Sequence, residues 1–520
     1  MRPRFAPPEP GTVGACPVAP DALQGIKRQQ TNPSRWPGDA WDAFAAALRA
    51  DGIELSESVA ARGAYATDAG GTAYGMPHGV VVARSAAQVA KLMRAAQAHR
   101  VPVTVRGGGL TTEGESVAFG GVLLDMTGMS RVVSIDRAGL TVRTQAGIFW
   151  HSLAEELRRE NLDYLSAPLN LTSSVGGSLG VGGIDVNSPR LGCSADQALA
   201  VQVVTPTGDI VECSDTENAD LFKRVILGYG QFGVITEATL RVRPYTPLRM
   251  HYYYYSSLRT AIEDLQLLDR NDASDYSGIL TILDCAVNLL VAFDSDEREA
   301  AFRANWASRL RGHGESGFML RALVHYALRP WKLGEALFLW RRKRELFPEL
   351  QRSEYMREGK MLDRTVVFSR AVWNFWGGRQ MVIPDVATSA EKFVAAVERG
   401  NAVCRKYFPQ YTLYCVGIRL RPEHREHYEM SCIPPDAEGW AYGCEFEPMT
   451  NGCDYSRDTL QSFKNEIYDI GVDLGGSYYR FGGMMKGYIR RVFGDEVVDR
   501  QLAMKKKADP AMILNRDVIF

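Results

Sequence analysis

The chain has 520 residues, which is too long for one ordinary core and predicts two or three domains. Its composition, with 46% hydrophobic and 23% charged residues, is typical of a globular protein, and a formal net charge of −1 argues against nucleic acid or an anionic membrane as a partner. No apolar run approaches the roughly 20 residues that cross a bilayer. The proline-rich residues 1–35 lack an apolar signal core, so we expect a disordered tail on a cytoplasmic protein.

The pattern from Trp36 to about Pro247 alternates between helical and strand-like segments, which indicates an α/β or α+β domain. Apolar residues at helical spacing predict helices at residues 41–49 and 86–99. Aliphatic and β-branched runs between turn signals predict strands at residues 101–105, 121–125, 140–144, 198–205 and 233–242.

The composition changes after about Arg249. The region up to Gly475 is rich in Trp, Tyr and Arg, as in His251–Tyr255 and Trp331–Phe347, and it predicts a second domain. The last part of the chain, from Tyr478, contains a helix-like segment at residues 495–507 that a proline ends.

Cysteine and histidine spacing argues against metal sites. The nine cysteines include no CxxC pair, and an odd number argues against a disulfide framework, so we expect buried reduced thiols, with a single structural disulfide as the alternative. His424 and His427 are three residues apart without an evident third ligand, which favours a solvated helix and no bound metal.

Two glycine-rich segments are candidates for binding a ligand. The first, Arg106–Gly114, follows a predicted strand, so its backbone N–H groups can approach a pyrophosphate while Arg106 helps to neutralise the charge; a surface turn is the alternative. A Cβ added at Gly108 is expected to collide with such phosphates. The second, Val175–Gly183, has five glycines in nine positions, which suits a backbone lying against a flat ligand, although a plain loop fits equally well.

A third segment, Val203–Thr236, begins as a strand–turn–strand and contains the sequence GYGQFGVIT. The order and spacing of the three segments resemble the FAD-binding domain of the vanillyl-alcohol-oxidase, or PCMH-type, superfamily. The third segment is especially similar to cytokinin dehydrogenases, and the final KKKADPAMILNRDVIF resembles the closing segment of that family. The resemblance is continuous over residues 80–247 and only general over residues 249–475.

The resemblance implies specific contacts to FAD. The pyrophosphate would lie on Gly107, Gly108, Gly109, Leu110, Thr111, Thr112 and Gly114, beside Arg106. The flavin ring and diphosphate would be lined by Ser174, Gly177, Ser178, Gly182 and Gly183. Val234 and Ile235 would hold the adenine half through their backbone, and Asn515 would approach the flavin ring from the C-terminal segment.

Two positions depart from the cytokinin dehydrogenase pattern. Leu110 stands where those enzymes have a histidine bonded covalently to the flavin, so we expect FAD without a histidyl link. Leu169, with Asn170 beside it, stands where they have a catalytic aspartate. Leucine cannot act as a base and an amide is a poor one, which argues against an amine substrate of the cytokinin kind.

Tyr479 and Arg480 resemble the pair that phenol-oxidising members of the superfamily use to stabilise a phenolate. The alternative is an ordinary strand end with an exposed arginine. A guanidinium is always charged and binds oxyanions in bidentate fashion, so Arg480 is suited to hold an anion.

These expectations combine into an α+β protein of two domains. A PCMH-type FAD-binding domain would take residues 36–247 and be completed by 478–520, and residues 248–477 would form an antiparallel-sheet domain that caps the flavin. The resemblance implies hydride removal from an activated C–H of an alcohol or phenol to flavin N5, with reoxidation by O2 or another acceptor. Tyr479, Arg480 and Asn170 are the candidate catalytic residues. Cytokinin-type amine oxidation and a flavin-binding protein without turnover are the alternatives, and a homodimer is left open.

Overall fold

The computed structural model of the protein describes residues 38–519, apart from residues 169–170, 185–187, 247–248, 284–285, 313–381, 409–412, 415–416, 421–432, 435–439, 449–455, 480–485 and 517. The expected N-terminal tail, the Trp331–Phe347 segment and the His424–His427 pair therefore lie outside the described residues.

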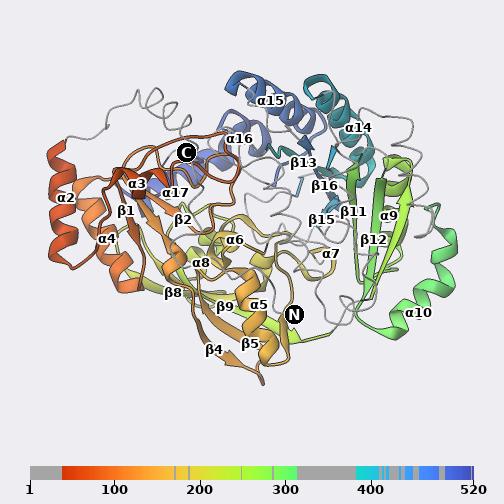
Figure 1. Cartoon of the computed structure of the whole chain (residues 1–520), viewed down its shortest axis with the longest axis horizontal. Coiled ribbons are helices and arrows are strands. Elements are labelled where there is room, and N and C mark those ends of the chain that lie inside the picture. Colours follow the sequence, from red (N-terminus) through yellow and green to blue (C-terminus); the bar gives the residue numbers. More distant parts are fainter. Residues whose placement is uncertain are drawn as a thin grey trace.

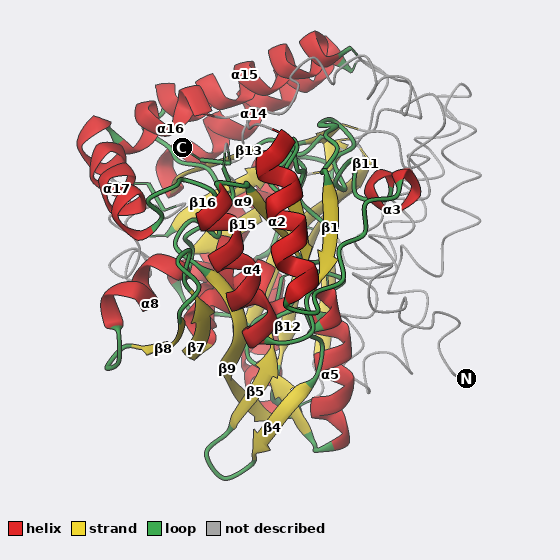
Figure 2. Cartoon of the chain, turned by 90° about the vertical axis from the view of Figure 1, so that its left-hand side faces the viewer, coloured by secondary structure: helices red, strands yellow, loops and turns green. Residues whose placement is uncertain are grey.

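The first part of the chain forms a small parallel sheet with the strand order β1-β3-β2. Its strands are β1 (Gly79–Val82), β2 (Val103–Arg106) and β3 (Val122–Asp125). Helix α4 (Ala86–His99) joins β1 to β2 and packs with α2 (Gly38–Ala50) on one side of the molecule, as Figure 2 shows. The Ser85 hydroxyl caps the start of α4 by accepting from Gln88 N, and Arg100 ends it in the left-handed conformation. A short helix, α3 (Val59–Gly63), precedes β1.

An antiparallel sheet of six strands follows, with the order β4-β5-β9-β7-β8 and with β6 paired to β9. The strands are β4 (Val132–Asp136), β5 (Thr141–Gln145), β6 (Leu162–Tyr164), β7 (Ala198–Val204), β8 (Ile210–Ser214) and β9 (Val234–Pro244). The helices between them are α5 (Trp150–Arg159), α6 (Val175–Val181), α7 (Ser188–Leu191) and α8 (Ala219–Val225). Fully buried Trp150 and Val203 belong to the core between this sheet and α5 and α6.

The second part lies at the right and top of Figure 1 and contains two antiparallel sheets of three strands. One has the order β10-β12-β11 and the other β13-β16-β15. Their strands are β10 (Arg249–Tyr255), β11 (Tyr276–Leu283), β12 (Ala286–Phe293), β13 (Asp385–Ser389), β15 (Gly417–Leu420) and β16 (Ala441–Glu445), and a further pair is formed by β14 (Leu413–Tyr414) and β17 (Glu447–Pro448). The flanking helices are α9 (Leu258–Arg270), α10 (Asp296–Asn305), α14 (Ala390–Tyr407) and α15 (Arg457–Asp473).

The last part of the chain returns to the first sheet. Helices α16 (Lys486–Phe493) and α17 (Asp495–Ala508) lead to Leu514, which forms a parallel bridge with Val103 of β2. Ile513 and Leu514 are buried in the core beneath α2 and α4. Residues 513–514 thereby share a core with helix α2 near the start of the described chain.

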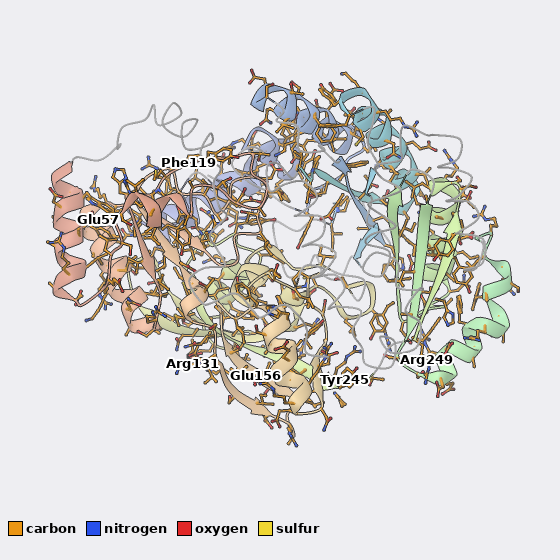
Figure 3. The ribbon with its side chains drawn as sticks, in the orientation of Figure 1. Glu57, Phe119, Arg131, Glu156, Tyr245 and Arg249 are labelled. Carbon is orange, nitrogen blue, oxygen red and sulfur yellow. The ribbon has the colours of Figure 1, made fainter. Side chains whose placement is uncertain are left out.

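The expected α+β architecture with an antiparallel second part is confirmed. The domain boundary expected between residues 247 and 248 stays a prediction; the chain passes there from β9 to β10, and Figure 3 labels Tyr245 and Arg249 on the two sides of this passage. Cys193, Cys213, Cys404 and Cys444 are buried thiols, whereas the other five cysteines lie outside the described residues. Among the described residues we find no helix long and apolar enough to span a membrane and no cluster suited to a metal ion.

Candidate functional site

The first glycine segment, Gly107–Gly109, turns directly out of β2 and lies against the second segment. A Cβ at Gly107 would lie 2.0 Å from Ser174 Oγ, and one at Gly108 would lie 2.7 Å from Thr172 O. Gly109 has φ +66°, a conformation that favours glycine. A Cβ at position 108 would therefore meet the protein's own backbone, and the expected approach of Gly108 to the phosphates stays a prediction.

Arg106 supports this segment from inside the protein. Its side chain is buried, and Nη1 donates to Thr67 O at 2.8 Å and to Ser116 O at 3.3 Å. The guanidinium also lies over the Tyr65 ring, 5.6 Å from its centre. The guanidinium thus fixes two backbone carbonyls, and its expected part in neutralising a pyrophosphate stays a prediction.

The continuation of the loop, Leu110–Thr112, is held by a turn that the sequence analysis did not recognise. Ala69 N donates to Gly109 O at 2.9 Å, and Gly70 N donates to Thr111 O at 3.1 Å, on either side of the half-buried Leu110. A Cβ at Gly70 would lie 2.5 Å from Thr112 O, so the two backbones are in close contact. The sequence DAGG at residues 68–71 was the available turn signal.

Three carboxylates organise the far end of this loop. Asp68 is fully buried and accepts hydrogen bonds from Thr111 Oγ1 at 2.8 Å and Gly114 N at 2.9 Å, while Glu115 Oε2 accepts from Glu113 N at 2.9 Å. Burial raises the pKa of Asp68 to about 6. Burial, followed by the nearby charges of Asp68 and Glu113, raises the pKa of Glu115 to about 8. None of the three was expected from the sequence.

The raised pKa values of Asp68 and Glu115 predict that the stability of the folded protein falls as the pH rises towards about 8. A carboxyl whose pKa is raised binds its proton more tightly in the folded state than in the unfolded state. For Glu115 the window runs from about 4.3 in the unfolded chain to about 8 in the folded chain. Glu115→Gln should flatten the decline in denaturation midpoint over the upper half of this window, beyond the pKa of Asp68. Parallel pH profiles for the variant and the wild type would contradict the assignment.

The second glycine segment forms helix α6 rather than a loop. Ser174 caps it by accepting from Gly177 N at 3.3 Å. Ser178 Oγ accepts from Trp150 Nε1 at 2.9 Å and donates to Ser174 O at 3.0 Å, which joins α6 to α5. Ser174 and Ser178 thus shape this wall of the site.

The turn that ends α6 depends on two glycines. Gly182 and Gly183 have φ values of +112° and +68°, and a Cβ at Gly183 would lie 1.8 Å from Ser194 Oγ. A side chain at either position would be strained.

Gly180 shows that the second glycine segment borders space that the described residues leave open. It is buried within α6, yet a Cβ added to it would have no heavy atom within 4 Å. The space beside the buried backbone of Gly180 has room for further atoms. A flat ligand lying against α6 would fit there. The residues present therefore fit the cofactor that the sequence implies.

Filling this space should weaken cofactor binding without harming the apoprotein. Gly180→Val adds side-chain volume where a ligand would lie, and overpacking of about 1–3 kcal/mol corresponds to a roughly 5- to 150-fold rise in the Kd for FAD. Gly487→Val on exposed α16, where a Cβ also meets no atom, is the matched control and should bind FAD like the wild type. Titration of apoprotein with FAD measures both. Wild-type affinity in Gly180→Val would assign this space to something other than the cofactor.

The third segment packs on α6. Leu227 N donates to Leu179 O and Tyr229 N donates to Gly180 O, both at 2.9 Å, and Leu227 and Tyr229 have positive φ values of 54° and 52°. Val234 and Ile235, at the start of β9, are in the ladder with Val204 and Val203 of β7. Their predicted contact with the adenine half stays a prediction.

Asn515 joins the C-terminal segment to two glycine segments. Its Oδ1 accepts from Val105 N at 2.8 Å, and Nδ2 donates to Gly230 O at 3.0 Å and Tyr229 O at 3.4 Å. A Cβ at Gly230 would lie 2.2 Å from Asn515 Nδ2. The side chain thus fixes the loops, and its approach to the flavin ring stays a prediction.

Lys505 of α17 is a second C-terminal link, which the sequence analysis named only as part of a motif. Nζ donates to Gln231 O at 2.6 Å and Leu514 O at 2.9 Å, and it pairs with Asp509 Oδ2 at 2.8 Å. Asp509 also accepts from Leu514 N and from Gln97 Nε2, at 2.8 and 2.6 Å. Burial lowers the pKa of Lys505.

Of the three candidate catalytic residues, the structure describes Tyr479; Asn170 and Arg480 lie outside the described residues. Tyr479 Oη accepts hydrogen bonds from Gly183 N at 3.0 Å and Ile184 N at 3.3 Å. Its own N–H donates to Asp385 Oδ1 of β13 at 2.5 Å. Tyr479 therefore connects the second part of the chain to the turn after α6, beside the space at Gly180.

Comparison with known proteins agrees with this arrangement. Residues 77–214 match the family described as "FAD binding domain". The chain is 35% identical over 204 residues to an uncharacterised oxidoreductase of the fasciation locus of Rhodococcoides fascians, a match over 38% of this chain and 45% of that protein. It is 33% identical over 211 residues to cytokinin dehydrogenase 7 of Oryza sativa subsp. japonica, over 38% of this chain and 39% of that protein. It is 30% identical over 174 residues to a D-lactate dehydrogenase of Anaerostipes hadrus, over 32% and 37%.

The match spans less than half of the length of each of these curated relatives. Over nearly the whole chain, the fold is similar to that of alkyldihydroxyacetonephosphate synthase, with a TM-score of 0.63, 16% identity, and coverage of 94% of this chain and 88% of that one. The FAD-binding match, the relatives and the shared fold agree with the three glycine segments and support the superfamily of PCMH-type FAD-binding oxidoreductases.

Proposed function

We propose that this protein is an FAD-dependent oxidoreductase that oxidises an activated C–H bond of an alcohol or phenol-type aromatic substrate. One observation carries the proposal: the first glycine segment packs on Ser174 at the start of α6 and the third packs on Leu179 and Gly180 near its end, where the described residues leave open space beside the buried Gly180. When bound there, FAD supplies the acceptor for the hydride, and O2 or another acceptor takes the electrons afterwards.

The residues of the chain have separate tasks in this proposal. Backbone N–H groups of Gly107–Thr111 hold the pyrophosphate, and α6 with Gly182 and Gly183 lies against the ring system. Tyr479 and Arg480 border the substrate and stabilise negative charge on its oxygen. The position of Tyr479 Oη at Gly183 N supports this placement.

The phenol or alcohol is favoured over an amine by the residue types available. No carboxylate stands at position 169, where an amine-oxidising enzyme of the cytokinin kind would have its base. An oxyanion needs stabilising charge rather than a carboxylate base, and Arg480 offers that charge. The cytoplasmic location and the homodimer stay predictions.

We also propose that FAD is held without a histidyl link, because Leu110 has no nucleophilic atom. Acid precipitation should release the yellow flavin into the supernatant. Flavin that remains with the pellet would contradict the proposal and would direct attention to Cys193, the buried thiol that follows the second glycine segment.

The activity is tested by mixing the flavin-loaded protein with candidate substrates in the absence of oxygen and recording the loss of flavin absorbance. Aryl alcohols and substituted phenols should bleach the flavin, and cytokinin-like secondary amines should not. Bleaching by amines alone would support the amine alternative. Bound flavin that no substrate class reduces would favour a binding protein without turnover.

A further inference from the structure

Helix α15 of the second domain reaches the first glycine loop through a buried ion pair. Lys464 Nζ lies 2.8 Å from Glu113 Oε2, and the two side chains are 0% and 1% exposed. The residues are 351 positions apart in the sequence. This contact links the loop assigned to the cofactor with the domain assigned to the substrate.

The pair lies in an acidic part of the loop. The carboxylates of Asp68 and Glu113 lie close to each other and to Glu115, which keeps its proton below its pKa of about 8. FAD adds two negative charges on its diphosphate, which are unfavourable beside uncompensated carboxylates. Lys464 therefore supplies, from the second domain, a positive charge that this loop requires.

Glu113 also retains an acceptor that the described protein does not use. Its Oε1 atom is buried and accepts no hydrogen bond from the residues that the structure describes. A buried acceptor without a donor costs about 1–3 kcal/mol. FAD carries hydroxyl donors on its sugar chains, so a bound cofactor has the chemistry to satisfy this atom.

We propose that Lys464 is a positioning residue for FAD: its ion pair with Glu113 holds residues 111–114 in the conformation that receives the cofactor, so that FAD binding depends on the docking of α15. The inference rests on the proposed role of the first glycine loop in binding FAD. It also requires the reverse effect, because linkage is reciprocal: bound FAD should stabilise the docking of α15.

The test uses the full-length apoprotein and FAD alone, without substrate. Lys464→Met leaves Glu113 as an uncompensated buried charge and should raise the Kd for FAD by about tenfold or more. Lys464→Arg keeps the charge and should recover part of the affinity. Lys406→Met is the matched control, because its exposed pair with Glu466 joins α14 to the same helix α15 and contributes little.

Hydrogen exchange separates positioning from general destabilisation. In the wild type, added FAD should protect the amides of α15, and this protection should be lost in Lys464→Met. If Lys464→Met does not fold, Glu113→Gln replaces it in both measurements, since it removes the charge at nearly constant volume. A Kd within about twofold of wild type, or unchanged protection of α15 in the variant, would overturn the inference. A wild-type protein that binds no FAD would instead overturn the proposed function.

Discussion

Replacing Lys505 with methionine should destabilise the folded protein by about 3–5 kcal/mol, the usual cost of breaking a buried ion pair on one side. The side chain is 2% exposed, and its ammonium group neutralises Asp509 while it donates to Gln231 O and Leu514 O. Methionine keeps most of the volume, but it leaves the buried Asp509 carboxylate without its counter-charge and the two carbonyls without the donor that Lys505 supplies.

Lys505→Met should also lower the FAD occupancy, because Gln231 and Leu514 are next to Gly230 and Asn515, which hold the third glycine segment. Denaturant unfolding followed by circular dichroism measures the stability, and the flavin-to-protein absorbance ratio measures the occupancy. Lys506→Met, one residue further along α17 and exposed, should behave like the wild type. Equal stability of the two variants would show that the Lys505 contacts contribute nothing.

Replacing Arg480 with methionine should lower the rate of flavin reduction by about 10²–10³, the typical effect of removing one preorganised donor from a developing oxyanion. The reason is chemical: the oxygen of a phenol or alcohol gains negative charge as the substrate is oxidised, and a guanidinium stabilises that charge. Tyr479, the preceding residue, lies at the turn after α6.

The flavin spectrum should stay intact in Arg480→Met, because the charge is assigned to the substrate. Stopped-flow reduction with a substrate found by the anaerobic screen provides the rate. Arg490→Met is a suitable control, since its ion pairs with Asp495 and Asp499 are on the exposed side of α16. A rate within threefold of wild type would make Arg480 a surface residue, and a loss of flavin would assign it to the cofactor.

Local sequence patterns predicted many of the helices and strands. The helix expected at residues 86–99 has those bounds in the structure, and the strands expected at 198–205 and 233–242 occur as Ala198–Val204 and Val234–Pro244. These segments have a clear period and a clear stop signal, so the sequence nearby decides their conformation. Helix α6 was not expected, because glycines disfavour a helix locally and only its packing against α5 and the third segment holds it.

The site was predictable only in part, for a related reason. Glycine segments are visible in the sequence, whereas their partners are distant residues that no local pattern identifies. Asp68 and Lys464 hold the first loop across the sequence, and Lys505 and Asn515 hold the third. The sequence also gives no sign of the direction in which a side chain would point. It suggested a role for Gly108, but not that a Cβ there would face Thr172 O.

The bond between Asn515 and Val105 has a consequence for the order in which the protein is made. The two residues are 410 positions apart. At about 5–20 residues per second, a ribosome needs roughly 20–80 s to add the residues between them. During that time β2 has emerged without its C-terminal neighbour, and the first glycine loop lacks the hydrogen bond at Val105 N. The nascent FAD-binding domain therefore stays incomplete until the C-terminal segment is made. A chain interrupted before residue 505 should be unable to retain FAD, even though residues 77–214 are complete.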